Sequence, residues 1–413
     1  MKQIFILITA ILSMIIVSQC GDSATESDQE MRELTVSEKK LVESDNLFGF
    51  KVFRKVAEIE TGRNMFISPL SISMALGMTL NGAEGVTEQE MEEVLELSGL
   101  TQEEINQSYQ SLIRLLSNLD PKVKFEIANS IWTRSGFDVK EPFYQNNRKY
   151  FDAEVAEVDF SSNSTVDRIN GWVGDKTHGK INQIVTPPIN PLTMMILINA
   201  IYFKGDWTTQ FSKDDTRPQT FYQSNGSTID CDMMNLEDKF KYMENDDIQA
   251  IELPYGDGDF SMAVMLPKEN DIGTDLDVLI GNLTSEYWGS LGDYYDSVEV
   301  DLYLPKFELE FKVVMNDILK TLGMPSAFDP QLSDFSGIAD IDDLHISEVL
   351  HKTYVKVDEE GTEAAAVTSV TVGTTSLPPD DIIMRVDRPF AFIIKENQSG
   401  TILFMGKVEN PSE

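Results

Sequence analysis

The sequence predicts an α+β fold in one large domain, which spans residues 45–413. Three observations lead to this prediction. Apolar residues recur at helical spacing through the N-terminal third, and alternating, strand-like patterns fill most of the remainder. No linker or internal repeat divides residues 45–413. Hydrophobic residues make up 41% of the chain, so a large continuous core can form.

The first 20 residues have the form of a secretory signal peptide. Lys2 precedes an apolar run over residues 4–17, which is shorter than a typical membrane span. Residues 17–21 (VSQCG) resemble a bacterial lipoprotein cleavage box in which Cys20 would carry the lipid, although Gln19 departs from the small residue expected there. We therefore expect an exported protein, either a cell-envelope lipoprotein or a freely secreted extracellular protein. Residues 21–44 are rich in Asp, Glu and Ser and predict an acidic, flexible tether.

Helices are predicted for much of the N-terminal third. Residues 41–60 place apolar side chains on one face of a first helix. Ser68 as N-cap and Pro69 at the first helical position begin a second helix that ends near Leu80. A Thr followed three residues later by a Glu predicts a capping box at 87–90 and another at 101–104, each at the start of a further helix. One more helix is predicted over residues 169–180.

Strand patterns begin near Lys124. Residues 194–203 form a run almost without charge, which is typical of a strand buried on both faces at the centre of a large sheet. Several short alternating stretches within residues 228–267 predict a second sheet. Residues 298–309 alternate between apolar and polar side chains and predict one half-exposed strand.

Composition excludes several function classes. The net charge of −36 leaves no basic surface for phosphate neutralisation, so no nucleic-acid partner is expected. Two cysteines and three histidines are too few for a Cys/His zinc centre, so no metal and no cofactor are predicted. No Gly-x-Ser-x-Gly elbow or phosphate-binding loop occurs, and the chain is therefore not expected to be an enzyme.

The segment that follows Val357 carries the most information about function. Residues 362, 364, 366 and 368 would share one small, mostly apolar face of a strand, and Glu363 on the other face would help to fix its register. Gly361, Gly373 and the prolines at 378–379 are loop signals. From the residues alone, both a loop and a strand stay open for this segment.

Nine separated motifs resemble, in order, those of the serpin family, and the resemblance covers nearly all of residues 45–413. They are 64–73 (NMFISPLSIS), 151–160 (FDAEVAEVDF), 169–181 (INGWVGDKTHGKI), 197–207 (LINAIYFKGDW), 252–255 (ELPY), 304–307 (LPKF), 322–328 (LGMPSAF), 388–390 (RPF) and 404–408 (FMGKV). The resemblance implies the serpin fold, which has three β-sheets, eight or nine helices and an exposed reactive-centre loop, here residues 359–379.

The resemblance also implies an inhibitor of serine proteases that acts once, as a suicide substrate. Inhibitory members share the hinge pattern Glu-x-Gly-Thr-Glu-Ala-Ala-Ala, and Val367 departs from the small residue usual after it. In this chain the hinge residues are Glu359, Glu360, Gly361, Thr362, Glu363, Ala364, Ala365, Ala366, Val367 and Thr368. Family spacing places the reactive bond between Thr375 and Ser376, with Val372 and Thr374 as alternative bait residues.

A small, β-branched bait residue implies an elastase-like or subtilisin-like target, and a cysteine protease is an alternative partner. After cleavage, the acyl-enzyme would stay attached while residues 362–375 insert into the central sheet. The alternative function is a non-inhibitory serpin that binds a ligand or assists folding. We expect a monomer for which loop–sheet polymers are a hazard, and membrane contact only through a lipid on Cys20.

Two polar groups of the family also match this sequence. The shutter residues, which lie under the central strands where the sheet must part, are Ser68, Ser71, Asn199 and His351. The breach residues, which lie where insertion begins, are Trp207, Lys306 and Glu359, and we expect an ion pair between Lys306 and Glu359.

Overall fold

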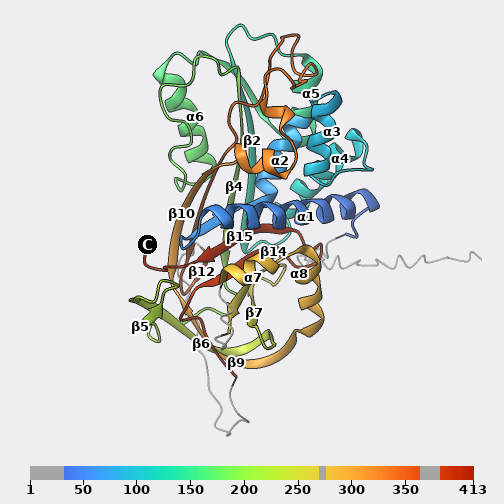
Figure 1. Cartoon of the computed structure of the whole chain (residues 1–413). Helices are drawn as coiled ribbons and strands as arrows, with labels where there is room; N and C mark the ends of the chain where they lie inside the picture. The colour runs from blue at the N-terminus through green and yellow to red at the C-terminus, as the bar shows by residue number, and fades with distance from the viewer. Residues whose placement is uncertain (1–31, 269–275, 363–381) are drawn as a thin grey trace, which may run out of the picture. The chain divides into compact units, whose positions relative to one another are not determined.

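The computed structural model describes residues 32–268, 276–362 and 382–413 (Figure 1). The predictions for Cys20, for the hinge residues 363–368 and for the reactive bond Thr375–Ser376 lie outside the described residues. The alternative bait residues Val372 and Thr374 lie outside them too, and all of these stay predictions.

The described residues contain nine α-helices and fifteen strands. The helices are α1 Val36–Ile59, α2 Pro69–Leu80, α3 Gly85–Val94, α4 Gln102–Leu116, α5 Glu141–Phe151, α6 Asn163–Lys176, α7 Leu276–Asn282, α8 Ser285–Leu291 and α9 Asn316–Leu322. The α+β prediction is therefore confirmed, with helices α1–α6 in the first half of the chain.

The strands form two hydrogen-bonded networks. The six-stranded sheet has the order β10-β11-β12-β4-β2-β3, and the nine-stranded network has the order β1-β15-β14-β8-β7-β6-β9-β13, with β5 also on β6. The bounds are β1 Met65–Ile67, β2 Val123–Arg134, β3 Glu154–Val158, β4 Met195–Asp206, β5 Arg217–Tyr222, β6 Thr228–Glu244, β7 Ile248–Tyr255, β8 Phe260–Pro267, β9 Asp296–Pro305, β10 Phe307–Val314, β11 Leu350–Val357, β12 Gly361–Thr362, β13 Ile382–Arg385, β14 Phe390–Glu396 and β15 Ile402–Val408.

The long strand β6 divides the nine-stranded network into two parts. Its residues 228–233 pair with β5, residues 233–242 pair with β9, and only residues 241–244 pair with β7. One part is therefore β5-β6-β9-β13 and the other runs from β7 to β1. Together with the six-stranded sheet, these two parts make the three sheets that were expected.

The single strand predicted over residues 298–309 is two strands. Strand β9 ends at Pro305 and pairs with β6, whereas β10 begins at Phe307 and pairs with β11 in the other sheet. Proline cannot donate a ladder hydrogen bond, and here it ends the strand. Lys306 therefore lies where the chain crosses from one sheet to the other.

Strand β4 is confirmed, but its burial on both faces is not. Ile198, Ala200 and Tyr202 are buried, whereas the alternate residues Asn199 and Ile201 are only half-buried. Among the described residues, β4 pairs along most of its length with β2 only, because β12 pairs with just its last two residues.

The predicted tether is too long at its C-terminal end. Helix α1 begins at Val36, and a capping box fixes this start: the Thr35 hydroxyl accepts from the Glu38 amide, and the Glu38 carboxylate accepts from the Thr35 amide at 2.7 Å. Leu41 and Val42 are buried in the core. Residues 36–44 are therefore the first part of a core helix and not a tether.

Of the helix starts predicted from capping residues, two are confirmed and one is wrong. Ser68 caps α2 with Pro69 in its first turn, and the capping box at 101–104 starts α4, as predicted. The capping box at 87–90 is wrong, because α3 already begins at Gly85 and Thr87 lies inside it. The Thr87 hydroxyl instead accepts from the Asp334 amide at 2.9 Å.

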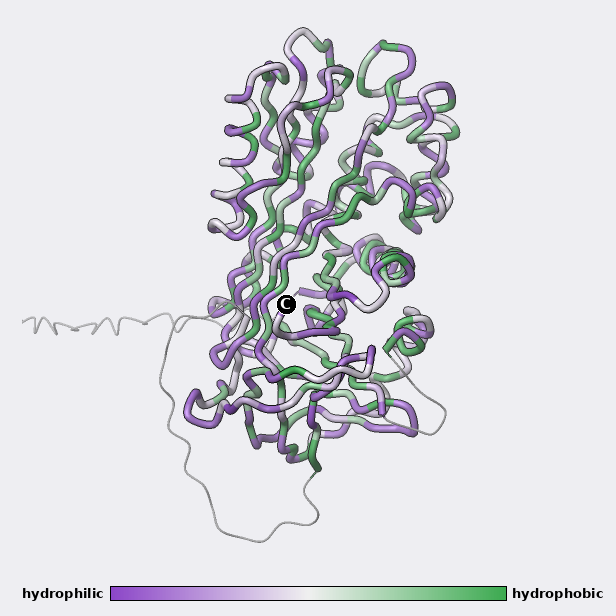
Figure 2. Tube along the Cα trace, turned by 60° about the vertical axis from the view of Figure 1, so that its left-hand side comes forward, coloured by the Kyte–Doolittle hydropathy of each residue, from purple (hydrophilic) through white to green (hydrophobic). Residues whose placement is uncertain are grey.

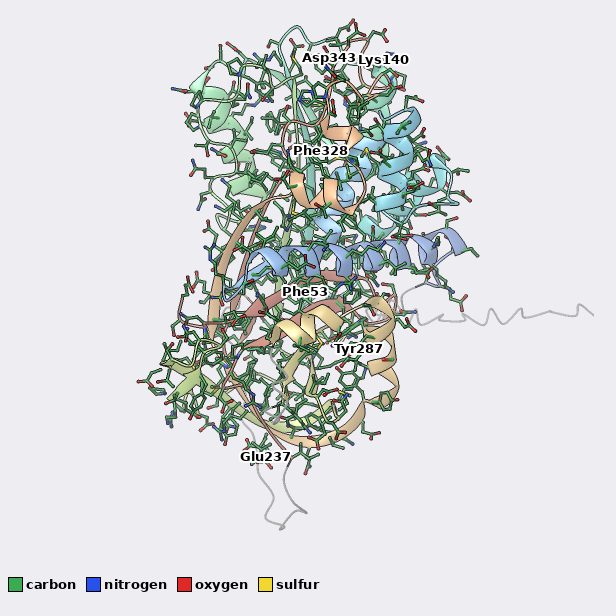
Figure 3. The ribbon with its side chains drawn as sticks, in the orientation of Figure 1. Phe53, Lys140, Glu237, Tyr287, Phe328 and Asp343 are labelled. Atoms are coloured by element: carbon green, nitrogen blue, oxygen red, sulfur yellow. The ribbon has the colours of Figure 1, made fainter. Side chains whose placement is uncertain are left out.

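Helices cover both faces of the six-stranded sheet (Figure 1). Helix α6 packs against one face, where Ile169, Trp132 and Ile198 share an apolar cluster, and α2 packs against β4 from the other side. Figure 2 shows the hydrophobic stretches concentrated along the strands, with hydrophilic stretches on the outer helices. Helix α1 crosses the middle of the domain, and its buried Phe53 points toward the layer that contains α7 and β15 (Figure 3).

A buried carboxyl group joins three of these helices. Asp45 of α1 accepts a hydrogen bond from the hydroxyl of Tyr109 of α4 at 3.1 Å, and Ser73 of α2 lies beside it. Its second oxygen, Oδ2, has no partner. Burial raises the pKa of Asp45 to about 7, although the neighbouring hydroxyls of Ser73 and Tyr109 oppose this rise.

We expect Asp45→Asn to stabilise the protein at neutral and alkaline pH. The native state keeps a proton on Asp45 that the unfolded chain has already released above pH 3.8, so wild-type stability falls as pH rises from about 4 to about 7. The difference in thermal midpoint between D45N and wild type should grow over this window, to a few °C, and then level off. The exposed control Asp342→Asn should follow wild type. Parallel pH profiles for D45N and wild type would contradict the raised pKa.

Candidate functional site

The candidate site is the point where the hinge segment enters the six-stranded sheet. Strand β12, Gly361–Thr362, lies between β11 and β4 and is antiparallel to both. Thr362 is opposite Val357 of β11 and Gly205 of β4, and Gly361 is opposite Asp206. The segment that the sequence left open as loop or strand is thus a strand in its first two residues.

Close backbone contact explains the glycine at position 361. Its φ is +153°, and a Cβ there would lie 2.1 Å from the backbone oxygen of Gly205. Gly205 is itself packed against the ring of Tyr255, so its backbone has no room to withdraw. A side chain at position 361 is therefore incompatible with β12 as it stands.

Two aromatic residues, Trp207 and Tyr255, contact β12 and the residues just before it. Trp207 stacks on Tyr255 with ring centroids 4.4 Å apart, and the Tyr255 hydroxyl shares a hydrogen bond of 2.7 Å with that of Thr362. The Trp207 amide donates to the Glu360 carbonyl, and its indole N–H donates to the Asp358 carbonyl at 3.0 Å. Trp207, predicted from the sequence as a breach residue, therefore contacts the hinge directly.

The expected ion pair at the breach is present. Lys306 Nζ lies 2.9 Å from Glu359 Oε2, and the Thr216 hydroxyl donates to Glu359 Oε1 at 2.8 Å. Burial acts to raise the pKa of Glu359, but the hydrogen bonds from Lys306 and Thr216 outweigh it and hold this pKa below its usual value. Glu359 thus stays ionised although only 4% of it is exposed.

Beyond Thr362, toward the first residues of β4 and β11, these two strands have a gap between them, here called the slot. In the described residues β4 pairs with β2 and β12, and β11 pairs with β10 and β12, but no ladder joins β4 to β11 directly. A cavity of about 20 Å³ lies in this slot, between Phe203 of β4 and Val355 of β11. Because β4 and β11 both run antiparallel to β12, one further strand in the direction of β12 could pair with both.

Residues after α6 cover the slot on the side away from α2. The ring of His178 packs on Tyr202 of β4 at 4.3 Å, and Lys180 Nζ lies 4.9 Å from the ring centroid of Tyr354 of β11. The short segment 178–180 therefore touches both strands that border the slot.

Three of the four predicted shutter residues form one hydrogen-bonded group. The Ser68 amide donates to His351 Nε2 at 3.0 Å, while the Ser68 hydroxyl accepts from the Ser71 amide and donates to the Leu403 carbonyl. Burial lowers the pKa of His351 to about 3, so the imidazole is neutral and can accept this bond.

Asn199, the fourth shutter residue, is bonded elsewhere. Its Nδ2 donates to Asn129 Oδ1 at 2.7 Å, and its own Oδ1 is buried without a partner. Asn129 was not predicted from the sequence, because only the pairing of β2 with β4 places it opposite Asn199. Asn199 and His351 lie on opposite sides of the slot.

Comparison with known proteins identifies the family. The family model described as "Serpin (serine protease inhibitor)" matches residues 43–411. The chain belongs to the serpin family. A serpin-like protein of Thermococcus kodakarensis is 36% identical over 384 residues, which are 91% of this chain and 87% of that protein.

Solved serpin structures agree over nearly the whole chain. Tengpin, a thermophilic serpin crystallised in its native state, matches with a TM-score of 0.83 and 34% identity, over 92% of this chain and 96% of tengpin. Human thyroxine-binding globulin in complex with its hormone matches with a TM-score of 0.81 and 27% identity, over 91% of this chain and 100% of that one. The family indicates protease inhibition in general, and serpins are generally not enzymes.

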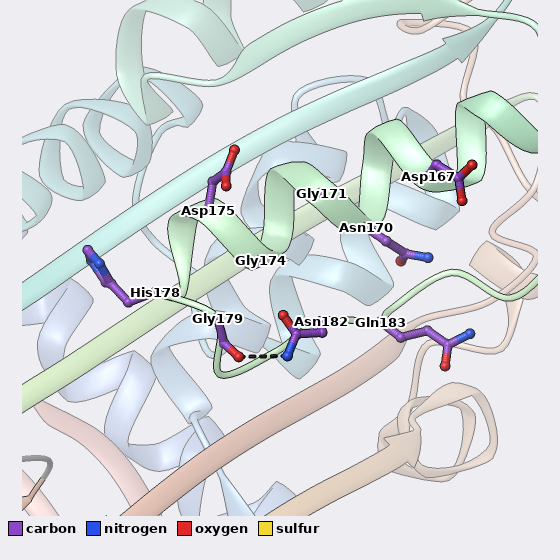
Figure 4. Close-up of a pocket in the computed structure, with 9 residues that line it drawn as sticks. All are labelled: Asp167, Asn170, Gly171, Gly174, Asp175, His178, Gly179, Asn182 and Gln183. Atoms are coloured by element: carbon purple, nitrogen blue, oxygen red, sulfur yellow. Dashed lines mark hydrogen bonds between the residues drawn. The ribbon is translucent and has the colours of Figure 1, made fainter.

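This serpin also has a surface hollow of about 790 Å³ beside α6 (Figure 4). Two of its polar side chains bond within the protein: Asn182 Nδ2 donates to the Gly179 carbonyl at 2.7 Å, and Asn170 Nδ2 donates to the Val185 carbonyl. These groups therefore serve the local structure. Across residues 32–268, 276–362 and 382–413, no group of His, Cys, Asp and Glu could hold a metal ion, and no helix is long and apolar enough to cross a membrane.

Replacing Gly361 by Ala should expel the hinge from the sheet of the native serpin. The added Cβ clashes with the backbone of Gly205, and such overpacking costs roughly 1–3 kcal/mol. Hydrogen exchange of the Thr362 amide should become about tenfold faster. Gly289→Ala is the matched control, because a Cβ at Gly289 meets no atom within 4 Å. Unchanged protection in G361A would show that the hinge does not need this close contact.

Proposed function

We propose that this serpin inhibits serine proteases as a suicide substrate, by inserting its cleaved loop between β4 and β11. The observation that supports this proposal is the position of β12, whose two residues lie between these strands above a slot where the two have no ladder to each other. A chain that continues from Thr362 would add a strand with antiparallel partners on both sides.

The register of β12 predicts the environment of each inserted residue. If the chain continues past Thr362 in this register, Ala364 lies between Val355 and Phe203, on the same face of the sheet as Thr362. The small residues of the hinge match this face, since Phe203 already fills space there with aromatic contacts to Tyr255 and Phe260. A larger side chain would have to displace part of the core.

The opposite face has complementary chemistry. Glu363 would lie between Lys356 of β11 and Lys204 of β4, so its carboxylate would meet two cations. Val367, which is larger than the residue usual in inhibitory serpins, would lie beside Ala200. Each of these outward positions therefore accepts the residue that this chain carries.

The length of the neighbouring strands also fits. In the same register Ser369 would reach Leu350, the first residue of β11, and Val372 would reach Met195, the first residue of β4. Residues 362–375 span 13 steps, which at about 3.3 Å each make roughly 43 Å. A protease attached to the loop end would be carried that distance.

The chemistry of trapping uses the protease's own mechanism. The serine oxygen attacks the carbonyl carbon of the bait residue, the bond from that carbon to the nitrogen of the next residue breaks, and the new amine takes a proton from the protease histidine. The bait carbonyl is then an ester of the protease serine. Insertion competes with hydrolysis of this ester. The rate of insertion relative to that of hydrolysis therefore decides between inhibition and simple cleavage.

The proposed reactive bond is Thr375–Ser376, with Val372 and Thr374 as alternatives. Residues 359–379 contain no Arg, Lys or aromatic residue, so a pocket with a buried carboxylate would gain nothing from them. We therefore propose an elastase-like or subtilisin-like target.

Mixing the serpin with pancreatic elastase should give a band of summed mass on a denaturing gel. Thr362→Arg should convert trapping to clean cleavage, because Thr362 is 2% exposed within the sheet and an arginine there would bury a charge where the inserted strand must begin. Thr61→Arg, at an exposed turn, should trap like wild type. Clean cleavage of the wild-type serpin would overturn the proposed function and favour a non-inhibitory binding role.

Thr368→Val should weaken the cleaved form without affecting the native one. In the register above Thr368 would lie between His351 and Asn199, where its hydroxyl can donate to the unpartnered Asn199 Oδ1. Losing a buried hydrogen bond costs about 1–3 kcal/mol. Denaturant unfolding of the cleaved variants should show this loss, and Ser369→Ala, at the neighbouring outward position, is the control. Equal unfolding midpoints for cleaved T368V and wild type would contradict the register.

A further inference from the structure

We propose that Lys213 is a positioning residue for loop insertion, which acts by holding the buried carboxylate of Glu360. This inference rests on the proposed function. It concerns a lysine in the segment after β4, and this lysine belongs neither to the shutter nor to the breach residues predicted from the sequence.

Glu360 immediately precedes β12 and is only 7% exposed. Its backbone is held on both sides: its carbonyl accepts from the Trp207 amide at 2.9 Å, and its amide donates to Asp358 Oδ1 at 3.0 Å. Lys213 forms an ion pair with its side-chain carboxylate. Lys306, the cation of the breach, contacts Glu359 instead.

The surroundings of Glu360 are acidic. Burial raises the pKa of Asp206, and the nearby charges of Glu360 and Asp358 raise it further, although Lys204 opposes them. Asp358 has its own cation, Lys356, at 3.2 Å. Without Lys213, the Glu360 carboxylate would therefore be buried near two other carboxylates with no cation of its own.

The segment that carries Lys213 is fixed to the hinge. The Trp207 and Phe211 amides donate to the carbonyls of Glu360 and Glu359, both at 2.9 Å, and the Thr216 hydroxyl donates to Glu359. Residues 207–216 thus contact the first two hinge residues, Glu359 and Glu360, and place Lys213 beside Glu360. The Lys213 side chain itself is 62% exposed, so salt can reach this ion pair.

Loss of the Lys213 charge should move Glu360 toward water. Gly361 follows Glu360 directly, so this movement draws β12 out of the slot, and insertion must then start from an expelled hinge. More of the acyl-enzyme would be hydrolysed before the protease is carried away. Lys213 therefore affects how the acyl-enzyme divides between trapping and hydrolysis, and not how fast the protease cleaves the loop.

The test uses the full-length serpin and pancreatic elastase. The stoichiometry of inhibition, measured as moles of serpin consumed per mole of elastase trapped, should rise roughly two- to tenfold in K213A and more in K213E. K213R should restore it, and so should the charge swap K213E/E360K. Added NaCl should raise the stoichiometry of wild type toward that of K213A and leave K213A nearly unchanged.

Lys241→Ala is the control for loss of a surface lysine. Lys241 forms an ion pair with Glu252, and the side-chain exposures of 63% and 10% match the 62% and 10% of the Lys213 pair, but Glu252 keeps a second cation, Lys395, at 3.1 Å. K241A should keep the wild-type stoichiometry, and the rate of loop cleavage should be the same in all variants. Hydrogen exchange of the Thr362 amide should be faster in K213A than in K241A.

The outcomes separate this inference from the proposed function. If wild type traps elastase but K213A has the wild-type stoichiometry and the wild-type exchange at Thr362, the role of Lys213 is refuted while the proposed function stands. If wild type is only cleaved, the proposed function is refuted and the inference with it. If K213E/E360K behaves like K213E, the effect does not pass through Glu360 and the inference is overturned.

Discussion

Strands β4 and β11 run side by side in one sheet, but in the described residues only Gly361 and Thr362 connect them. Every backbone group that faces the slot below Thr362 could gain a ladder partner, and a net hydrogen bond is worth about 0.5–1.5 kcal/mol. If the cleaved loop inserts as proposed, the sheet with the added strand has the lower free energy. The proposed mechanism therefore requires a barrier that keeps the native sheet from reaching that state, so it requires kinetic stability. The hinge, the shutter group and the segment after α6 all border this slot.

Charge determines where the added strand can begin. Glu359 and Glu360 are nearly buried, which is costly for ionised groups unless cations hold them. Lys306 comes from the crossing between two sheets and Lys213 from the segment after β4, so two separate parts of the chain bind consecutive hinge residues. This arrangement fixes the backbone at 359–360, from which the strand in the proposed insertion would grow. Because the first hinge residues are already paired in the sheet, the proposed insertion would extend an existing strand and would not have to form a new one.

Some helix starts could be predicted from neighbouring residues in the sequence. Contacts between distant segments could be predicted only through the family resemblance. Ser68, Pro69 and the capping box at 101–104 act within one helical turn and were predicted from local spacing, but the same spacing at 87–90 failed, because Thr87 lies inside α3. The ion pair of Lys306 with Glu359 joins residues 53 positions apart and was expected only because the motifs match serpins. Lys213 is outside every such motif, and nothing local marks it as a partner of Glu360. The break between β9 and β10 was missed because both strands share one alternating pattern, which does not record a change of sheet.

The polar residues that face the slot suggest how a unique register is selected. A strand that slipped by one residue would turn Glu363 toward the core, which would bury an unpaired charge. A slip by two residues keeps the same face inward, so apolar packing alone discriminates weakly against it, although Glu363 would lose its place between Lys356 and Lys204. The slip would also place Ala366 or Val370 between Asn199 and His351, and neither can donate to the unpartnered Asn199 Oδ1. Inside the sheet, one threonine opposite one unsatisfied carbonyl thus adds about the cost of an unmade buried hydrogen bond to the preference for the correct register.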